Sequence, residues 1–204
     1  MNMLNKSIPG VIEVLILKNA KVITQERIIE NGGIIIQEDK ITGVFKNDEF
    51  TSQENTKVID VNGYYISAGF IDIHTHGGGG YDFMDGSLEA FIEGVRAHLP
   101  YGTTSIVPTT LTSTKESLFK TFDIMKEVKN YAHAGPNILG IHLEGPYIAH
   151  EQKGAQDPKY IKDPDQDEYM EILNYSDDIV RWTIAPERPG ALQLGKILTE
   201  RGIV

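Results

Sequence analysis

Two patterns of hydrophobic and polar residues divide this chain of 204 residues near position 67. In the first part, short apolar and β-branched runs alternate with turn residues such as Asn31-Gly32-Gly33 and Asn62-Gly63, a pattern that predicts strands. The predicted strands are 14–17, 21–23, 33–37, 41–45, 57–61 and 64–66. We expect residues 1–66 to form a small N-terminal β-sandwich portion.

From residue 67 onward the pattern predicts an α/β fold, because apolar strand-like runs alternate with amphipathic helical segments. Strands are predicted at 70–74, 104–109, 138–143 and 179–185, and helices at 87–99, 114–131, 167–174 and 191–201. Such alternation implies a parallel sheet, either doubly wound or closed as a (β/α)8 barrel. A complete barrel needs eight units and about 250 residues, so four units amount to half of one. Ile203-Val204 reads as the start of another strand.

His74 and His76 close the first apolar run of this second part, and the glycine run 77–80 follows them. Side chains alternate between the two faces of a strand, so the two imidazoles point the same way. Two neutral imidazoles on one face at a strand end make half of a transition-metal site. A single histidine on a strand is more often structural, but an alternating pair before a glycine run favours metal binding.

Glu144 ends the apolar run 141–143 and precedes Gly145-Pro146, a turn that interrupts the strand. A carboxylate in that place is either buried and paired or a metal ligand. The alternative, an exposed glutamate in a loop, fits the rigid turn less well. His142 lies on the same face as Glu144, and it either supports the site or packs within the strand.

Composition narrows the possible partners of the chain. Its formal net charge of −10 and pI of about 5.0 argue against nucleic acid and anionic membranes. It has no cysteine, so histidine, aspartate or glutamate must hold any metal ion. No apolar run approaches the roughly 20 residues of a transmembrane helix. The N-terminal residues lack the apolar core of a signal peptide, so we expect a cytoplasmic protein.

Five segments of the chain carry a more specific signal. They are His74-x-His76 with its glycine run, Tyr101-Gly102-Thr103-Thr104 with Pro108-Thr109, Leu143-Glu144-Gly145-Pro146-Tyr147, Lys153-Gly154-Ala155-Gln156, and Ile184-Ala185-Pro186-Glu187. In this order, and over nearly the whole chain, they resemble the N-acetylglucosamine-6-phosphate deacetylase family of the amidohydrolase superfamily. The histidine pair alone marks only the superfamily, whereas the Leu-Glu-Gly-Pro segment followed by Lys-Gly-Ala is much more specific.

The resemblance implies a (β/α)8 TIM-like barrel with a small β-sandwich built from both chain ends. Residues 1–66 would then be the sandwich portion, and residues 67–204 an incomplete barrel of about four βα units. It also implies that Glu144 is the principal metal ligand and that His74 and His76 bind a second metal ion. The divalent metal would be zinc, iron or manganese, with one or two ions bound.

The resemblance further implies hydrolysis of the acetamide of N-acetylglucosamine 6-phosphate, which gives glucosamine 6-phosphate and acetate. Ala155 and Gln156 match a segment that binds this small-molecule amino-sugar phosphate. Many relatives have histidine where this chain has Gln156, and glutamine can hydrogen-bond a substrate but supplies no charge. The full-length protein is expected to be a homodimer.

Two histidine ligands and the aspartate that acts as acid/base are expected beyond Val204, as the resemblance implies. We therefore expect the 204-residue chain to be an inactive fragment that is poorly folded or oligomeric. Two other hypotheses stay open: an amidohydrolase for a cyclic amide or another N-acetyl compound, and a non-catalytic half-barrel that binds sugar phosphate. His98, near a helix end, is expected on the surface.

Overall fold

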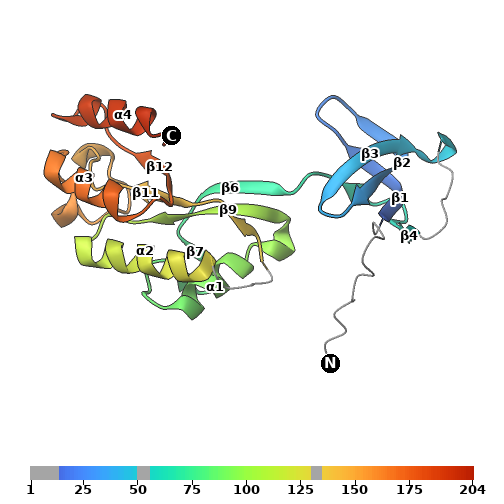
Figure 1. Ribbon diagram of the computed structural model, residues 1–204, viewed down its shortest axis with the longest axis horizontal. Helices are drawn as coiled ribbons and strands as arrows, with labels where there is room; N and C mark the ends of the chain where they lie inside the picture. The colour runs from blue at the N-terminus through green and yellow to red at the C-terminus, as the bar shows by residue number, and fades with distance from the viewer. Residues whose placement is uncertain (1–13, 50–55, 130–134) are drawn as a thin grey trace. The chain divides into compact units, whose positions relative to one another are not determined.

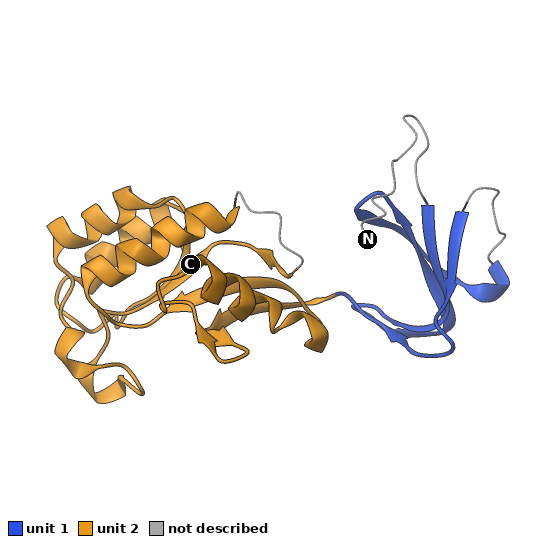
Figure 2. Ribbon diagram, turned by 90° about the horizontal axis from the view of Figure 1, so that it is seen from below, with its two compact units in different colours: residues 1–68 blue, residues 69–204 orange. Residues whose placement is uncertain are grey.

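The computed structural model describes residues 14–49, 56–129 and 135–204. The chain divides into two compact units, residues 1–68 and residues 69–204 (Figure 2). The division lies between Ala68 and Gly69, where the alternation of strands and helices begins. The last two residues of the helix predicted at 114–131 lie outside the described residues.

The first unit is built around one mixed sheet with the strand order β3-β2-β1-β4, in which β5 also pairs with β1. Its elements are β1 (Val14–Ile23), β2 (Ile28–Gln37), β3 (Lys40–Lys46), the 3-10 helix η1 (Asn47–Glu49), β4 (Thr56–Asp60) and β5 (Tyr65–Ile66). Ala20, Val22 and Ile34 form its small buried core. The described residues of this unit contain no second sheet, so the predicted β-sandwich is not confirmed.

One long strand, β1, replaces the two short strands predicted at 14–17 and 21–23. The pairing of β1 with β2 shifts register between Leu17 and Ala20, and Asn19 between them has a φ of 55°. Asparagine tolerates this left-handed conformation better than most residues, because its short side chain can bond locally. The Asn19 amide nitrogens donate to Asn47 and Asp60, so the irregularity is held without ending the strand.

The second unit is an α/β unit with a parallel sheet (Figure 1). Its strands are β6 (Phe70–Thr75), β7 (Gly77–Gly78), β8 (Tyr81–Asp82), β9 (Thr103–Thr110), β10 (Asn137–Ile138), β11 (Ile141–Glu144) and β12 (Ile179–Thr183). Its helices are α1 (Leu88–Arg96), η2 (Leu99–Tyr101), α2 (Lys115–Lys129), η3 (His150–Gln152), η4 (Pro158–Tyr160), α3 (Gln166–Tyr175) and α4 (Ala191–Glu200). Each predicted strand and helix of this region has a counterpart with shifted ends, and the strand predicted at 138–143 is divided into β10 and β11.

The sheet follows chain order from β6 through β9 and β11 to β12, with every pairing parallel. In a doubly wound sheet the order of the strands reverses at a switch point, whereas in a (β/α)8 barrel the strands follow one another in chain order. Arg181 on β12 donates from Nη1 to the carbonyl of Ile73 on β6 at 3.1 Å. Neighbouring strands lie about 4.8 Å apart, so this bond between opposite edges requires a curved sheet. The order of the strands and the curvature of the sheet are those of a partial barrel.

Side chains cap three of the four α-helices at their first turn. The hydroxyl of Ser87 accepts from the amide of Ala90 at the start of α1, as predicted. Thr114 accepts from Ser117 in the same way before α2. A cap of this kind satisfies an amide that has no partner within the helix.

Two buried apolar clusters join the helices to the sheet. The first lies between α2, α3, α4 and the strands β11 and β12, and includes Phe122, Leu143, Tyr169, Trp182 and Leu194. The second joins α1 and α2 to β9 and includes Phe83, Phe91, Ile106, Met125 and Val128. Burial of these side chains fixes the strands whose ends carry the polar residues discussed below.

The strand predicted at 138–143 is interrupted, with β10 and β11 as its two parts. A Cβ at Gly140 would lie 2.4 Å from a side-chain carbon of Val180, so the chain approaches the neighbouring strand closely there.

Beyond β12, Val204 donates to the carbonyl of Val180 and accepts from the amide of Trp182, as a further parallel strand would. In the described parts of the chain, no helix is long and apolar enough to cross a bilayer.

Leu194→Ala tests the core under α4, where Leu194 is fully buried. We expect a loss of about 2–5 kcal/mol in the free energy of unfolding, because the methyl groups removed leave a cavity. Leu192 of the same helix is 77% exposed, and Leu192→Ala should change stability by less than about 0.5 kcal/mol. Denaturant unfolding followed by circular dichroism measures both. Equal losses would contradict the assignment of this core.

Candidate metal centre

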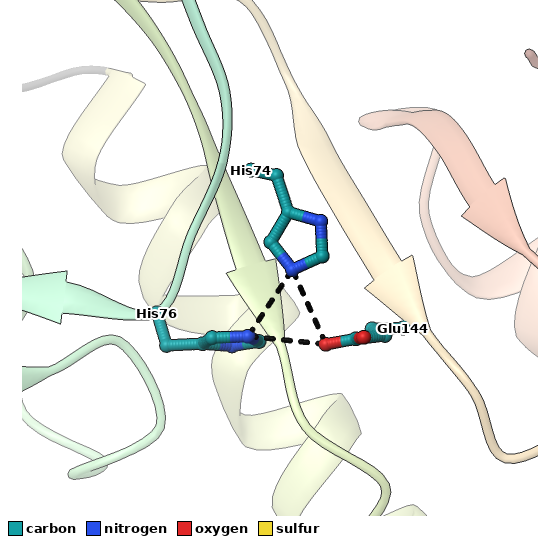
Figure 3. A group of neighbouring side chains, drawn as sticks. All are labelled: His74, His76 and Glu144. Carbon is teal, nitrogen blue, oxygen red and sulfur yellow. Dashed lines mark hydrogen bonds and ion pairs between the residues drawn. The ribbon is translucent and has the colours of Figure 1, made fainter. Parts of the chain in front are cut away.

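β6 presents two imidazoles at its carboxyl end. His74 lies within the strand and His76 directly follows it, so alternation places both side chains on one face. Their Nε2 atoms lie 3.3 Å apart (Figure 3). The glycine run that follows turns back at once, since Gly77 and Gly78 pair with Tyr81 and Asp82 in a two-stranded hairpin.

Glu144 reaches the same place from the end of β11, with β9 lying between the two strands. Its Oε2 atom is 3.3 Å from Nε2 of His74 and 3.0 Å from Nε2 of His76. Figure 3 shows the three side chains pointing toward one another. The structure thus brings together the three residues predicted to bind metal, and no other cluster of this kind is found among the described residues.

The spacing and chemistry of these three atoms fit the ligand shell of a transition metal. Ligands that bind one ion at about 2.0–2.2 Å lie roughly 3.0–3.5 Å apart in tetrahedral and octahedral shells. Imidazole nitrogen and carboxylate oxygen suit zinc, iron and manganese. The side chains of His74, His76 and Glu144 are 40%, 32% and 22% exposed, so the centre is open to small molecules.

The ring of His76 is oriented by the backbone of β9. Its Nδ1 atom lies 3.2 Å from the carbonyl oxygen of Thr109, which can only accept a hydrogen bond. Nδ1 therefore carries the proton, and the lone pair of a neutral ring is left on Nε2, facing the cluster. A second hydrogen bond of this type is usual for a metal-binding histidine, because it fixes the tautomer and raises ligand basicity.

His142 lies fully buried on β11, two residues before Glu144. Its Nδ1 atom is 3.2 Å from the hydroxyl of Thr109, and its Nε2 atom is 2.7 Å from the hydroxyl of Thr183. Burial, together with a smaller effect of the positive charge of Arg181, lowers the pKa of His142 to about 3. The imidazole is therefore neutral at physiological pH, and it is bonded at both nitrogens.

The turn after Glu144 is fixed by contacts from two neighbouring segments. The indole nitrogen of Trp182 donates to the carbonyl of Gly145 at 2.9 Å, and the Thr112 hydroxyl donates to the carbonyl of Glu144 at 3.4 Å. Gly145 has a φ of 82°, and a Cβ there would lie 2.3 Å from Oγ1 of Thr112. Only glycine fits this turn without displacing Thr112.

The two residues predicted to bind substrate lie in different environments. Ala155 is exposed, whereas Gln156 is only 4% exposed. The side-chain oxygen of Gln156 accepts from the backbone amide of Thr112 at 2.6 Å. Gln156 thus ties its loop to the residue that holds the Glu144 carbonyl, and a role of either residue in substrate binding stays a prediction.

His98 was predicted to lie on the surface, and the structure shows it only partly exposed and engaged with the backbone. His98 is half-buried, and its Nε2 atom lies 3.0 Å from the carbonyl oxygen of Gly77, the residue that follows His76. It therefore supports the glycine loop beside the cluster. Thr183 and Trp182 were missed as well, because only strand pairing brings β12 to the residues around Glu144.

Comparison with known proteins identifies the family that this arrangement matches. The Amidohydrolase family matches residues 65–198, which include all three side chains of the cluster. The chain is 32% identical over 176 residues to N-acetylglucosamine-6-phosphate deacetylase of Haemophilus influenzae. That alignment covers 85% of this chain and 45% of the relative. The chain spans about half the length of the curated relatives it matches.

Solved structures show the same likeness in three dimensions. The N-acetylglucosamine-6-phosphate deacetylase of Pasteurella multocida matches with a TM-score of 0.82 and 30% identity, over 94% of this chain and 49% of that one. The deacetylase of Mycobacterium smegmatis in complex with N-acetyl-D-glucosamine-6-phosphate matches with a TM-score of 0.80 and 28% identity. That match covers 94% of this chain and 49% of the other.

Gln156→Leu tests the tie between Gln156 and Thr112. The change removes the acceptor of a buried amide, so we expect unfolding free energy to fall by about 1–3 kcal/mol. Gln152 lies nearby but is exposed, and Gln152→Leu should leave stability nearly unchanged. Chemical denaturation of both variants gives the comparison. No difference between them would show that the Gln156 contact contributes nothing to the fold.

Proposed function

Because the chain belongs to the amidohydrolase family, we propose that His74, His76 and Glu144 bind divalent metal for an amide-hydrolysing enzyme. The proposed reaction is hydrolysis of the acetamide of N-acetylglucosamine 6-phosphate to glucosamine 6-phosphate and acetate. The observation that carries the proposal is the triangle of donor atoms, with edges of 3.0–3.3 Å, at the carboxyl ends of β6 and β11. In barrels of this type, that end of the strands carries the active site.

The side chains that would hold the metal ion have defined protonation states. His76 keeps its proton on Nδ1, bonded to the Thr109 carbonyl, and so offers Nε2. The carboxylate of Glu144 supplies negative charge, which favours binding of a divalent cation at the cluster over binding of an uncharged molecule. The chemistry that such an ion supplies when bound is activation of water and polarisation of an amide carbonyl. We propose zinc, iron or manganese, in one or two ions, on the chemistry of this donor set.

The proposed substrate rests on the relatives. The similar proteins from Haemophilus influenzae and Bacillus subtilis are N-acetylglucosamine-6-phosphate deacetylases. Ala155 is exposed in the loop after Glu144, which is consistent with contact to a bound amino-sugar phosphate. We propose that Ala155 and Gln156 line the substrate site, with Gln156 acting chiefly through the loop that it fixes.

We also propose the wider setting that the resemblance implies. Residues 67–204 would be part of a (β/α)8 barrel, and residues 1–66 part of a small β-sandwich. The full-length enzyme would be a homodimer that acts in the cytoplasm on a small molecule. The singly wound order of β6, β9, β11 and β12 supports the barrel.

Titration of the 204-residue chain with zinc tests the proposed ligands. Glu144→Gln keeps the size of the side chain but removes its charge, and His76→Ala removes one nitrogen ligand. We expect each change to weaken zinc binding by about 100-fold or more, beyond the 10–100-fold typical of residues that only support ligands. Competition with a chromophoric chelator measures the dissociation constants.

Two nearby exposed residues provide matched controls for this titration. Glu151→Gln and His150→Ala make the same chemical changes in η3, and neither residue belongs to the cluster. Both variants should bind zinc like the unaltered chain. An unchanged zinc affinity in Glu144→Gln would contradict the assignment of the ligands. An equal loss of zinc affinity in the two controls would contradict it as well.

Acetate release from N-acetylglucosamine 6-phosphate tests the assignment of the acid/base. The resemblance assigns this role to an aspartate beyond Val204, so the 204-residue chain should bind zinc yet release no acetate. An enzyme-coupled acetate assay on the zinc-loaded chain makes the measurement. If the 204-residue chain does release acetate, and Glu144→Gln abolishes that activity, then an acid/base group lies within these residues and the assignment is contradicted.

A further inference from the structure

The two histidines of the cluster are oriented in different ways. Nδ1 of His76 is bonded to the Thr109 carbonyl, as is usual for metal-binding histidines. Among the hydrogen bonds found in the described residues, none engages Nδ1 of His74. The orientation of the His74 ring must therefore come from another source. Two rings pack against it with planes at 83°: that of His76, with centroids 5.2 Å apart, and that of His142, with centroids 4.9 Å apart. Of these two, only His142 is not itself a proposed ligand.

His142 is itself held from both sides. Thr109 on β9 faces its Nδ1 atom at 3.2 Å, and Thr183 on β12 faces its Nε2 atom at 2.7 Å. A hydroxyl can donate or accept, so both nitrogens are satisfied in either tautomer. A ring bonded at both nitrogens cannot rotate about its χ2 angle without losing a hydrogen bond. The orientation of its ring relative to His74 is thereby fixed.

We propose that His142 is a positioning residue for His74, and that Thr183 and Thr109 hold it in that role. The proposal rests on the proposed metal centre. An unconstrained His74 would have to be ordered when metal binds, and this ordering would lower the affinity. The fixed ring of His142 limits the orientations of His74 in advance. The three residues lie on the adjacent strands β9, β11 and β12, directly beside the ligands.

The polar character of this position supports a role beyond packing. Burying an imidazole removes it from water and demands two hydrogen-bond partners, which an apolar ring of similar size would not need. A purely structural histidine would affect the stability of the fold and leave the zinc affinity of the folded protein unchanged. Zinc affinity is therefore the measurement that separates the two roles.

Thr183→Val tests the proposal with little change in side-chain volume. The variant removes the hydroxyl from Nε2 of His142, replaces no proposed ligand, and keeps the backbone of Thr183 that pairs with Glu144. We expect the dissociation constant for zinc, measured by chelator competition on folded protein, to rise about 10-fold or more, within the range for residues that support ligands. Thr183→Ser restores the hydroxyl and should recover most of the affinity.

Thr121→Val is the matched control. Thr121 is also buried, and its hydroxyl bonds to the Ser117 carbonyl within α2, far along the chain from the ligands. This variant should bind zinc like the unaltered chain. Should Thr183→Val fail to fold, Thr183→Ala removes the same hydroxyl without adding a methyl group, and it should show the same loss.

The outcomes separate the two proposals. Weaker binding in Thr183→Val with recovery in Thr183→Ser supports the positioning role. Tight binding in the unaltered chain and equally tight binding in Thr183→Val overturns that role and leaves the metal centre standing. Absence of zinc binding in the unaltered chain overturns the metal centre, and with it the role of His142.

Discussion

The parallel pairing of β6, β9 and β11 is the constraint on which the rest of the site depends. His74 and His76 come from one strand and Glu144 from another, and these two strands do not pair with each other. β9 lies between them, and its pairing with each strand sets their relative position along the strand direction. The register that places Thr75 beside Pro108, and His142 beside Thr109, also brings the three donor atoms within 3.3 Å of one another. A shift of one residue in either pairing would turn the ligands to the other face.

Thr109 shows how the central strand serves the site without binding anything itself. Its carbonyl faces Nδ1 of His76, while its hydroxyl accepts from the Thr75 amide and lies next to Nδ1 of His142. One fully buried residue thus contacts the strands on both sides. Glu144 is held in a comparable way, because Trp182 and Thr112 fix the backbone of the turn that follows it. The side chains of the cluster are partly exposed to solvent, whereas the residues that hold them in place, such as Thr109, Thr112 and Trp182, are buried.

Much of this could be predicted from local sequence patterns. Alternation of polar and apolar residues located the strands and helices of residues 69–204, and the His-x-His pair and Glu144 were recognised from their positions at strand ends. His142 was named as a possible support of the site, but the contacts that hold the supporting residues were not predicted, since they join segments far apart in the sequence. Thr183 and His142 are 41 residues apart, and Gln156 and Thr112 are 44 apart. The continuous strand β1 was missed because Asn19 looks like a turn residue and instead forms an irregularity within the strand.

X-ray absorption at the zinc edge of the metal-loaded 204-residue chain tests the central claim most directly. We expect a first shell of nitrogen and oxygen ligands at about 2.0–2.2 Å, with the outer-shell scattering that two imidazole rings produce. The same spectrum from His74→Ala should lose the scattering of one ring. A first shell without imidazole scattering, or a spectrum that does not change in His74→Ala, would contradict the assignment of this cluster as the metal centre.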